Sequence, residues 1–146
     1  MTSILSFENV SKGLGEGKSR KDVLRAIDLD VAEGEFVAIL GFSGSGKSTL
    51  MNLMAGLVTP DQGTVTFKVK PVTGPGPERG LVFQSYSLMP WLTVAVNVML
   101  AVEAVHPELS KSDKAAKAQR YIEMVGLGHA TTRRPAELSG GMRQRV

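Results

Sequence analysis

One stretch of nine residues holds the side chains and spacing that bind a polyphosphate. Lys47 follows a glycine-rich turn in the order G-x-x-x-x-G-K-[ST], the pattern of a phosphate-binding loop. Its glycines let successive backbone N–H groups turn inward, where a Cβ would obstruct the phosphates. Lys47 would supply a mobile charge for the β- and γ-phosphates of a nucleoside triphosphate, and the Ser48 hydroxyl can be a ligand for Mg²⁺. The predicted nucleotide-binding residues here are Gly41, Phe42, Ser43, Gly44, Ser45, Gly46, Lys47, Ser48 and Thr49.

The sequence on both sides of this loop has the pattern that the motif requires. The apolar run 35–40 has the length of a buried strand, and the segment 48–56 has a helical pattern with Gly56 as its C-cap. Strand, loop and helix in this order direct the positive end of the helix dipole at the phosphates. The alternative is a Gly/Ser-rich turn that fits by accident, and the two correct flanks argue against it.

The remaining elements predict a β-rich first half and a mostly helical second half. Strands are expected at 4–10, 63–67 and 81–84, and at 23–31 with one apolar face formed by Val23, Ile27, Leu29 and Val31. The first strands should form an antiparallel layer on the nucleotide-binding core. Residues 11–22 and the Pro/Gly-rich residues 71–78 are predicted loops. Helices are expected from Thr93 to Val105, from about Ser110 to Gly126, and at the C-terminal end.

The composition excludes several classes of site. Lys and Arg are spread along the chain and the net charge is only +3, so we expect no nucleic-acid partner. Cys is absent, which excludes disulfides and thiolate metal sites and fits a reducing compartment. The apolar run 88–102 is shorter than the roughly 20 residues of a spanning helix and is interrupted by Pro90 and Asn97. We therefore expect a soluble helix there, and the N-terminus shows no signal-peptide pattern.

Three motifs in order resemble the ATP-binding cassette (ABC) transporter ATPases. They are the phosphate loop, Phe83-Gln84 at the end of an expected strand, and Leu138-Ser-Gly-Gly-Met142 at the start of a helix. Residues 74–84 and 90–93, and Met142 where most of the family has Gln, are similar to the importer ATPases of the nitrate/sulfonate/taurine group. His106-Pro107 and residues 134–146 are most similar to nitrate importers.

The resemblance implies an α/β fold of the P-loop NTPase class. It would comprise an N-terminal antiparallel β layer, a partial RecA-like core and a helical subdomain, in one C-terminally incomplete ABC ATPase domain over residues 1–146. Residues 1–86 would hold the β layer and the phosphate-loop core, and residues 87–140 the helical subdomain. Residues 138–146 would hold the signature motif and the start of its helix.

The resemblance also assigns roles to residues outside the phosphate loop. Gln84 would reach Mg²⁺ or the attacking water. Lys47 and Gln84 are therefore the catalytic candidates, and Ser48 and Gln84 are the candidate metal ligands. The alternative for Gln84 is a hydrogen bond that caps the end of a strand. The signature residues would bind the γ-phosphate of ATP held by a second subunit. That role implies a head-to-tail dimer, with a second copy or another ABC ATPase, whereas the alternative is an ordinary Ser N-cap. These signature residues are Ser139, Gly140, Gly141 and Met142.

Residues 84–97 would face transmembrane permease subunits, with Pro90 and Trp91 in the contact. The alternative for Trp91 is a place in the core. The resemblance therefore implies a peripheral protein on the cytoplasmic face of the plasma (inner) membrane.

The chain departs from the family pattern at three places. The strand ending in Asp-Glu and the switch histidine do not follow the signature, so we expect these 146 residues alone to be a marginally stable fragment without useful ATP hydrolysis. Leu14 stands where the family stacks adenine on an aromatic residue, which predicts weaker base recognition. Val69 stands where the importer group has a turn glycine; a positive φ there would strain it by roughly 1–3 kcal/mol.

The function that these features favour is that of an ATP-binding subunit of an ABC importer, which couples ATP binding and hydrolysis to the transport of a small, nitrate-like anion. One alternative is a nucleotide-binding or interaction module that is catalytically incomplete. Another is a DNA-repair or translation factor of the same superfamily; the chain shows no coiled-coil insertion and no basic stripe that would favour it.

Overall fold

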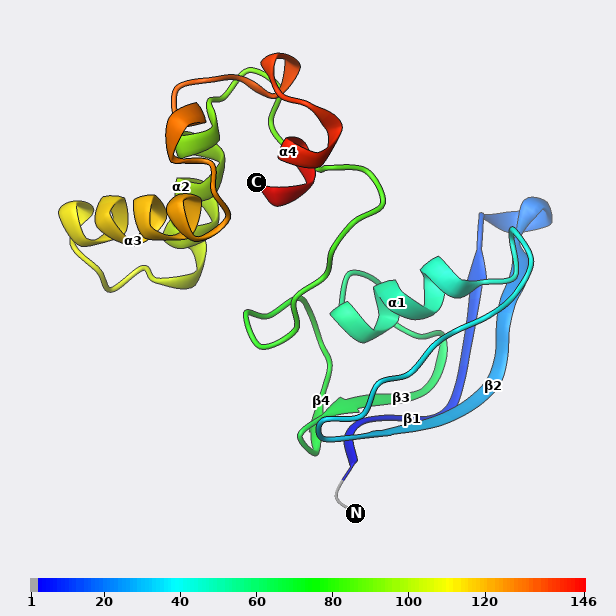
Figure 1. Cartoon of the computed structure of the whole chain (residues 1–146). Coiled ribbons are helices and arrows are strands. Elements are labelled where there is room, and N and C mark those ends of the chain that lie inside the picture. Colours follow the sequence, from blue (N-terminus) through cyan, green and yellow to red (C-terminus); the bar gives the residue numbers. More distant parts are fainter. Residues whose placement is uncertain (1–2) are drawn as a thin grey trace. The chain divides into compact units, whose positions relative to one another are not determined.

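The computed structural model describes residues 3–146. They fall into two compact units, one that ends at Leu81 and one over Val82–Val146 (Figure 1). The first unit contains a sheet and one helix. The second unit is helical. This division confirms the β-rich first half and mostly helical second half that the sequence predicts.

The sheet of the first unit is antiparallel and has the strand order β2-β1-β3-β4. Its strands are β1 (Ser3–Leu14), β2 (Lys21–Ala32), β3 (Gln62–Phe67) and β4 (Lys70–Pro71). The predicted antiparallel layer is therefore confirmed. Strands β1 and β2 extend further than predicted, so the loop expected over residues 11–22 is reduced to a short hairpin tip with the 3-10 turn Gly17–Ser19.

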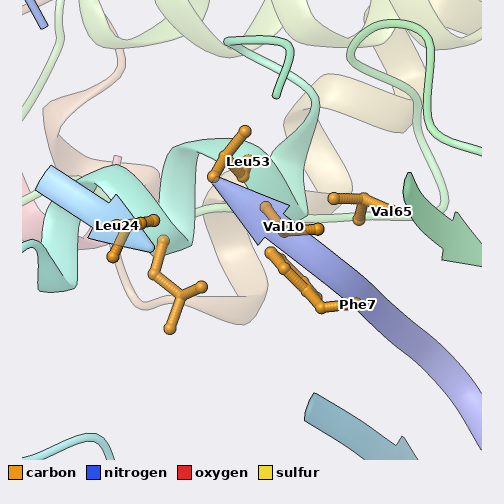
Figure 2. Close-up of a cluster of buried hydrophobic side chains, with 6 residues drawn as sticks. Phe7, Val10, Leu24, Leu53 and Val65 are labelled. Atoms are coloured by element: carbon orange, nitrogen blue, oxygen red, sulfur yellow. The ribbon is translucent and has the colours of Figure 1, made fainter. Parts of the chain in front are cut away.

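Helix α1 (Lys47–Ala55) packs on this sheet and forms the core of the unit with it. Figure 2 shows Leu53 of α1 close to Phe7 and Val10 of β1 and Val65 of β3. The helix ends at Gly56, whose φ of 76° is the left-handed conformation that favours glycine at this position. Removal of these apolar side chains from water holds α1, and the loop before it, against the sheet.

A β-bulge in β2 changes which of its residues face the core, so the face predicted for this strand is only partly right. Leu24 is 7% exposed and belongs to the core, although strict alternation places it on the opposite face from Val23 and Ile27. Between the pairs Val10↔Ile27 and Lys12↔Leu24 the strand β2 has one residue more than β1, and Ala26 there has a φ of 46°. The extra residue breaks the alternation, so the apolar face changes partway along the strand.

Two predicted strands are absent from the described residues. Segments 35–40 and 81–84 have no regular structure. Phe36 and Leu40 are 92% and 91% exposed, and Val82 is 86% exposed. A strand of a parallel sheet gains its hydrogen bonds only from neighbouring strands, and none lies beside either segment in the part of the chain that the structure describes. The apolar composition was read correctly, but the strand assignment was wrong for this structure.

The second unit contains the three predicted helices, α2 (Val94–Val105), α3 (Lys111–Met124) and α4 (Gly140–Arg145). Thr93, Ser110 and Ser139 cap them, each accepting a hydrogen bond from the backbone N–H three residues later. Short 3-10 turns cover Gly128–Ala130 and Pro135–Glu137. The unit has its own core, formed by Val94, Ile122, Leu127, Ala130 and Leu138. Within residues 3–146, no helix has both the length and the apolar character needed to cross a bilayer.

Candidate nucleotide-binding site

The phosphate loop leads directly into α1, as the sequence predicts. Gly44 and Gly46 have φ values of 80° and 95°, and Gly46 is the N-cap of the helix. L-residues with a side chain rarely adopt this conformation, so both positions require glycine. The first helical hydrogen bond runs from the N–H of Leu50 to the carbonyl of Gly46. The N–H groups of the first turn therefore have no partner within the helix and are available to an anion.

Packing on the neighbouring hairpin also requires glycine at position 46. A Cβ there would lie 2.9 Å from Leu24 Cδ2 and 3.1 Å from Val23 Cγ1, both on β2. At Gly41 a Cβ would lie 2.5 Å from Ser45 Oγ, within the loop itself. Gly44, by contrast, faces open space. The loop is thus anchored to β2 at its helical end and open at its centre, where phosphates would approach.

The Lys47 side chain reaches back across the loop. Its Nζ donates hydrogen bonds of 2.7 Å to the carbonyl oxygens of Gly41 and Phe42, and lies 3.4 Å from Ser45 Oγ. The ammonium group is therefore already inside the loop, and phosphate oxygens would replace the carbonyl oxygens as its partners.

The two hydroxyl residues after Lys47 differ in accessibility. Ser48 is exposed, so its Oγ is free to bind a metal ion next to bound phosphates. Thr49 is only 8% exposed. The residues present at this site fit a Mg²⁺–ATP complex, with Ser48 rather than Thr49 as the accessible hydroxyl.

Gln84 lies in the second unit, in a segment without regular structure. It is exposed, and its side chain makes no hydrogen bond to another residue that the structure describes. The strand end that was expected to position it is absent, so the alternative role as a strand cap does not apply in this structure.

The signature residues form the start of α4. Ser139 Oγ accepts a hydrogen bond of 3.3 Å from the N–H of Met142, and Gly141 has open space around it. Gly140 is crowded, because a Cβ there would lie 3.2 Å from Tyr86 Oη. The guanidinium of Arg143 lies 4.8 Å from the centre of the Tyr86 ring. Sequence reasoning missed Tyr86 and Arg143, which join the segment after Gln84 to the signature helix.

The exposure of Trp91 excludes one of the two roles considered for it, a place in the core. Trp91 is 66% exposed, so it is not part of the core of the described second unit. The loop that carries it is fixed by Asn97, which accepts a hydrogen bond from Met89 N–H and donates to the carbonyl of Leu92. An exposed tryptophan on a held loop is the kind of surface that a protein partner covers.

A second feature that the sequence did not reveal is an ionic cluster around Asp61. Its carboxylate accepts from Arg20 at 2.6 Å, from Lys12 at 3.0 Å and from the N–H of Gly13 at 2.7 Å. The hydrogen bond from the Gly13 backbone, followed by that from Lys12, lowers the pKa of Asp61. The cluster ties the tip of the β1–β2 hairpin to the turn before β3. No local pattern could have indicated it, because its members are up to 49 residues apart.

Comparison with known proteins places these motifs in one family. The family model described as ABC transporter matches residues 24–146. The bicarbonate transport ATP-binding protein CmpC of Synechococcus elongatus is 47% identical over an alignment of 147 positions, which covers 100% of this chain and 22% of that protein. The nitrate transport protein NasD of Klebsiella oxytoca is 41% identical over an alignment of 147 positions, which covers 100% of this chain and 56% of that protein.

A solved structure shows the same fold. The ATP-binding cassette MJ0796, in a dimeric structure of a post-hydrolysis state bound to ADP and Pi, has a TM-score of 0.81 and 31% identity. The match covers 97% of this chain and 66% of that one. The chain spans about a fifth of the length of CmpC and just over half of the length of NasD.

Proposed function

The chain belongs to the ABC transporter family, and from this premise we propose that it forms the nucleotide-binding part of the ATP-binding subunit of an importer. The observation that carries the proposal is the arrangement of Lys47 and the first turn of α1 around one glycine loop. Such a loop presents backbone N–H groups, a helix dipole and an ammonium group to the same anion.

ATP is the ligand that this loop fits. The N–H groups around Gly44 and Gly46 would surround the β-phosphate, while Lys47 neutralises charge on the β- and γ-phosphates. Ser48 supplies an accessible hydroxyl that would hold a bound Mg²⁺, and the metal would neutralise negative charge on the phosphates.

Gln84 and the signature residues complete the proposed catalytic unit. Gln84 is exposed and has no hydrogen-bond partner among the residues that the structure describes, so its amide would be able to meet the metal or the attacking water. Ser139, Gly140, Gly141 and Met142 would bind the γ-phosphate of ATP held by a second subunit. The dimer in the solved cassette MJ0796 supports such a pairing, with the partner either a second copy or another ABC ATPase.

The transported substrate that we propose is a small oxyanion. Relatives at 41–47% identity bear the names of bicarbonate and nitrate transport proteins. The segment 84–97, with the exposed Trp91, would meet permease subunits at the cytoplasmic face of the membrane, so that the protein is held there peripherally. The domain limits inferred from the resemblance, with the helical subdomain at 87–140, stay part of this proposal.

Isothermal titration with Mg²⁺–ATP tests the nucleotide site. Lys47→Ala should weaken ATP binding at least about tenfold, because it removes a charge-assisted contact to the phosphates. Lys111→Ala, a matched change at the exposed start of α3, should bind ATP as the unchanged chain does. Equal affinity in the Lys47→Ala variant would refute the proposed site.

A further inference from the structure

We propose that a hollow beside the β3–β4 turn binds a small organic molecule through its phosphate group. The hollow has a volume of about 530 Å³ and is lined by the end of β3, the turn, β4 and the Pro/Gly-rich loop over residues 73–79. All of these residues belong to the first unit, and none belongs to the phosphate loop. The inference goes beyond the proposed function, because it concerns a second anion site that does not depend on ATP.

Positive charge dominates the side chains that line the hollow. Lys68, Lys70 and Arg79 carry three positive charges, and Glu78 carries the one negative charge. Glu78 is paired with Arg79, whereas neither lysine has a carboxylate partner among the residues that the structure describes. Two unpaired ammonium groups on one cavity raise the local concentration of anions and favour a ligand that carries two negative charges.

The turn that carries the two lysines is held in place by the sheet. The N–H of Lys68 donates a hydrogen bond of 2.8 Å to the carbonyl of Ile4, and the N–H of Val72 donates one of 2.8 Å to the carbonyl of Val65. The Nζ of Lys68 lies 5.6 Å from the centre of the Phe67 ring, so its ammonium group packs on an aromatic ring and not on a carboxylate. Both lysines are exposed and therefore accessible to an anion.

Arg79 fixes the loop side of the hollow. Its side chain is only 12% exposed, and its Nη2 donates a hydrogen bond to the carbonyl of Gly74. Its guanidinium also lies 5.5 Å from the centre of the Phe67 ring. The Nε of this guanidinium is buried and has no hydrogen-bond partner among the described residues. A buried donor without a partner costs free energy, and an anion in the adjoining hollow would reduce this cost electrostatically.

The loop also offers a polar group and room for a ligand. Thr73 is exposed, so its hydroxyl can donate to an anion in the hollow. A Cβ on Gly74 would meet no atom within 4 Å, so the backbone next to Thr73 borders open space. Ammonium and hydroxyl groups together are typical donors to phosphate oxygens.

Charge and size both favour a phosphorylated small molecule over a monovalent ion. A phosphate monoester carries a charge of about −1.5 to −2 at pH 7, which matches the two unpaired lysines. The volume of about 530 Å³ falls within the roughly 300–1,000 Å³ of cavities that hold small organic molecules. A bare monovalent ion would neutralise only one of the two lysines and leave most of the hollow unfilled.

Glycerol 3-phosphate, titrated into the full ¹⁵N-labelled chain with Lys47→Ala at constant ionic strength, tests this site without the phosphate loop. Saturable shifts should fall on the amides of residues 68–79. Inorganic phosphate should shift the same amides but bind more weakly, because it lacks the organic part, and nitrate should produce no saturable change. An unchanged spectrum away from the substituted residues shows that each variant is folded.

Two double variants, made in the same chain, separate the site from overall charge. Lys68→Gln with Lys70→Gln should weaken glycerol 3-phosphate binding at least about tenfold, because it removes both unpaired charges. The matched pair Lys21→Gln with Lys111→Gln removes the same charge at exposed positions on β2 and α3. It should change the affinity less than about twofold.

Four results would overturn the inference. Shifts confined to residues 44–49 of the unchanged chain, and absent from the Lys47→Ala chain, would assign phosphate binding to the phosphate loop alone. Equal weakening in the two double variants would show that only overall charge matters. An equal response to nitrate would indicate screening by any anion, and equal affinity for inorganic phosphate would exclude an organic ligand. Because the titrated chain lacks Lys47, these outcomes are separate from any failure of the proposed ATP site.

Discussion

Single backbone angles decide which residues this chain tolerates at its turns. Gly44 and Gly46 adopt positive φ values in the phosphate loop, where the sequence supplies glycine. The two-residue turn between β3 and β4 is different, since Lys68 and Val69 have φ values of 48° and 60°. Two positive angles in a two-residue hairpin are typical of a type I′ turn, which favours Asn and Gly. A β-branched residue in this conformation is strained.

Replacement of Val69 by glycine should therefore stabilise the protein. The change relieves roughly 1–3 kcal/mol of strain, against about 0.5–1 kcal/mol for the greater freedom of glycine in the unfolded chain. Val69 is 83% exposed, so little buried apolar surface is lost. Urea unfolding should show a gain of about 0.5–2 kcal/mol. The matched change Val82→Gly, at an exposed valine without a positive φ, should give no gain in stability. A Val69→Gly variant whose urea midpoint is unchanged or lower would show that the turn carries no strain.

At the scale of elements, the β1–β2 hairpin is held to β3 by the charges around Asp61. Lys12 and Arg20 come from the hairpin, and Asp61 precedes β3 directly. The lowered pKa of Asp61 means that its charged form is favoured by the folded state. Between the lowered value and the ordinary carboxylate value, the unfolded chain binds more protons than the folded one. This contribution to stability is therefore complete above about pH 4 and is lost as the pH falls through the lowered value.

The Asp61→Asn variant should show this pH dependence directly. It should melt at a lower temperature than the unchanged chain at pH 7, and the difference should shrink as the pH falls from about 4, the ordinary carboxylate value, through the lowered pKa of Asp61. Thermal melts from pH 7 to pH 2.5 at low salt provide the measurement. A difference that stays constant down to the lowest pH would mean that the carboxylate charge does not hold the hairpin.

Local signals explain why the helices were predictable and two of the strands were not. Thr93, Ser110 and Ser139 cap helices within three residues of themselves, so the sequence predicts these helix starts without knowledge of the fold. Segments 35–40 and 81–84 have strand composition, but a strand exists only with a neighbour to pair with. Leu24 was not among the residues predicted for the apolar face, because the bulge at Ala26 leaves no periodic signal.

In the candidate site, too, some features could be predicted from the sequence and others could not. The phosphate loop is one continuous stretch with a fixed spacing, so its residues and its helix could be identified from sequence alone. Contacts between distant segments could not. Tyr86 approaches Gly140, and Arg20 approaches Asp61, through tertiary packing that no local pattern records.

At the scale of the whole molecule, an apolar segment lies uncovered in the first unit. Phe36, Leu40 and Phe42 are each more than nine-tenths exposed. Adjacent exposed residues of this kind drive association with other apolar surfaces. We therefore expect the chain to associate through this segment.

The double variant Phe36→Ser with Leu40→Ser should therefore reduce self-association. Light scattering of the unchanged chain should rise with protein concentration, and the double variant should scatter less at each concentration. Met124→Ser, a change at a 70% exposed position on α3, is the control for apolar loss elsewhere. Scattering reduced as much by Met124→Ser as by the double variant would show that segment 35–42 has no special part in association.

The central claim is that the backbone of the phosphate loop and the first turn of α1 bind the phosphates of ATP. Amide chemical shifts of the ¹⁵N-labelled chain, recorded as Mg²⁺–ATP is added, test it at the atoms concerned. The largest changes should fall on the N–H groups of residues 44–49, and inorganic tripolyphosphate should produce them as well. Saturable ATP binding that leaves these amides unshifted, or that shifts another region instead, would contradict the account.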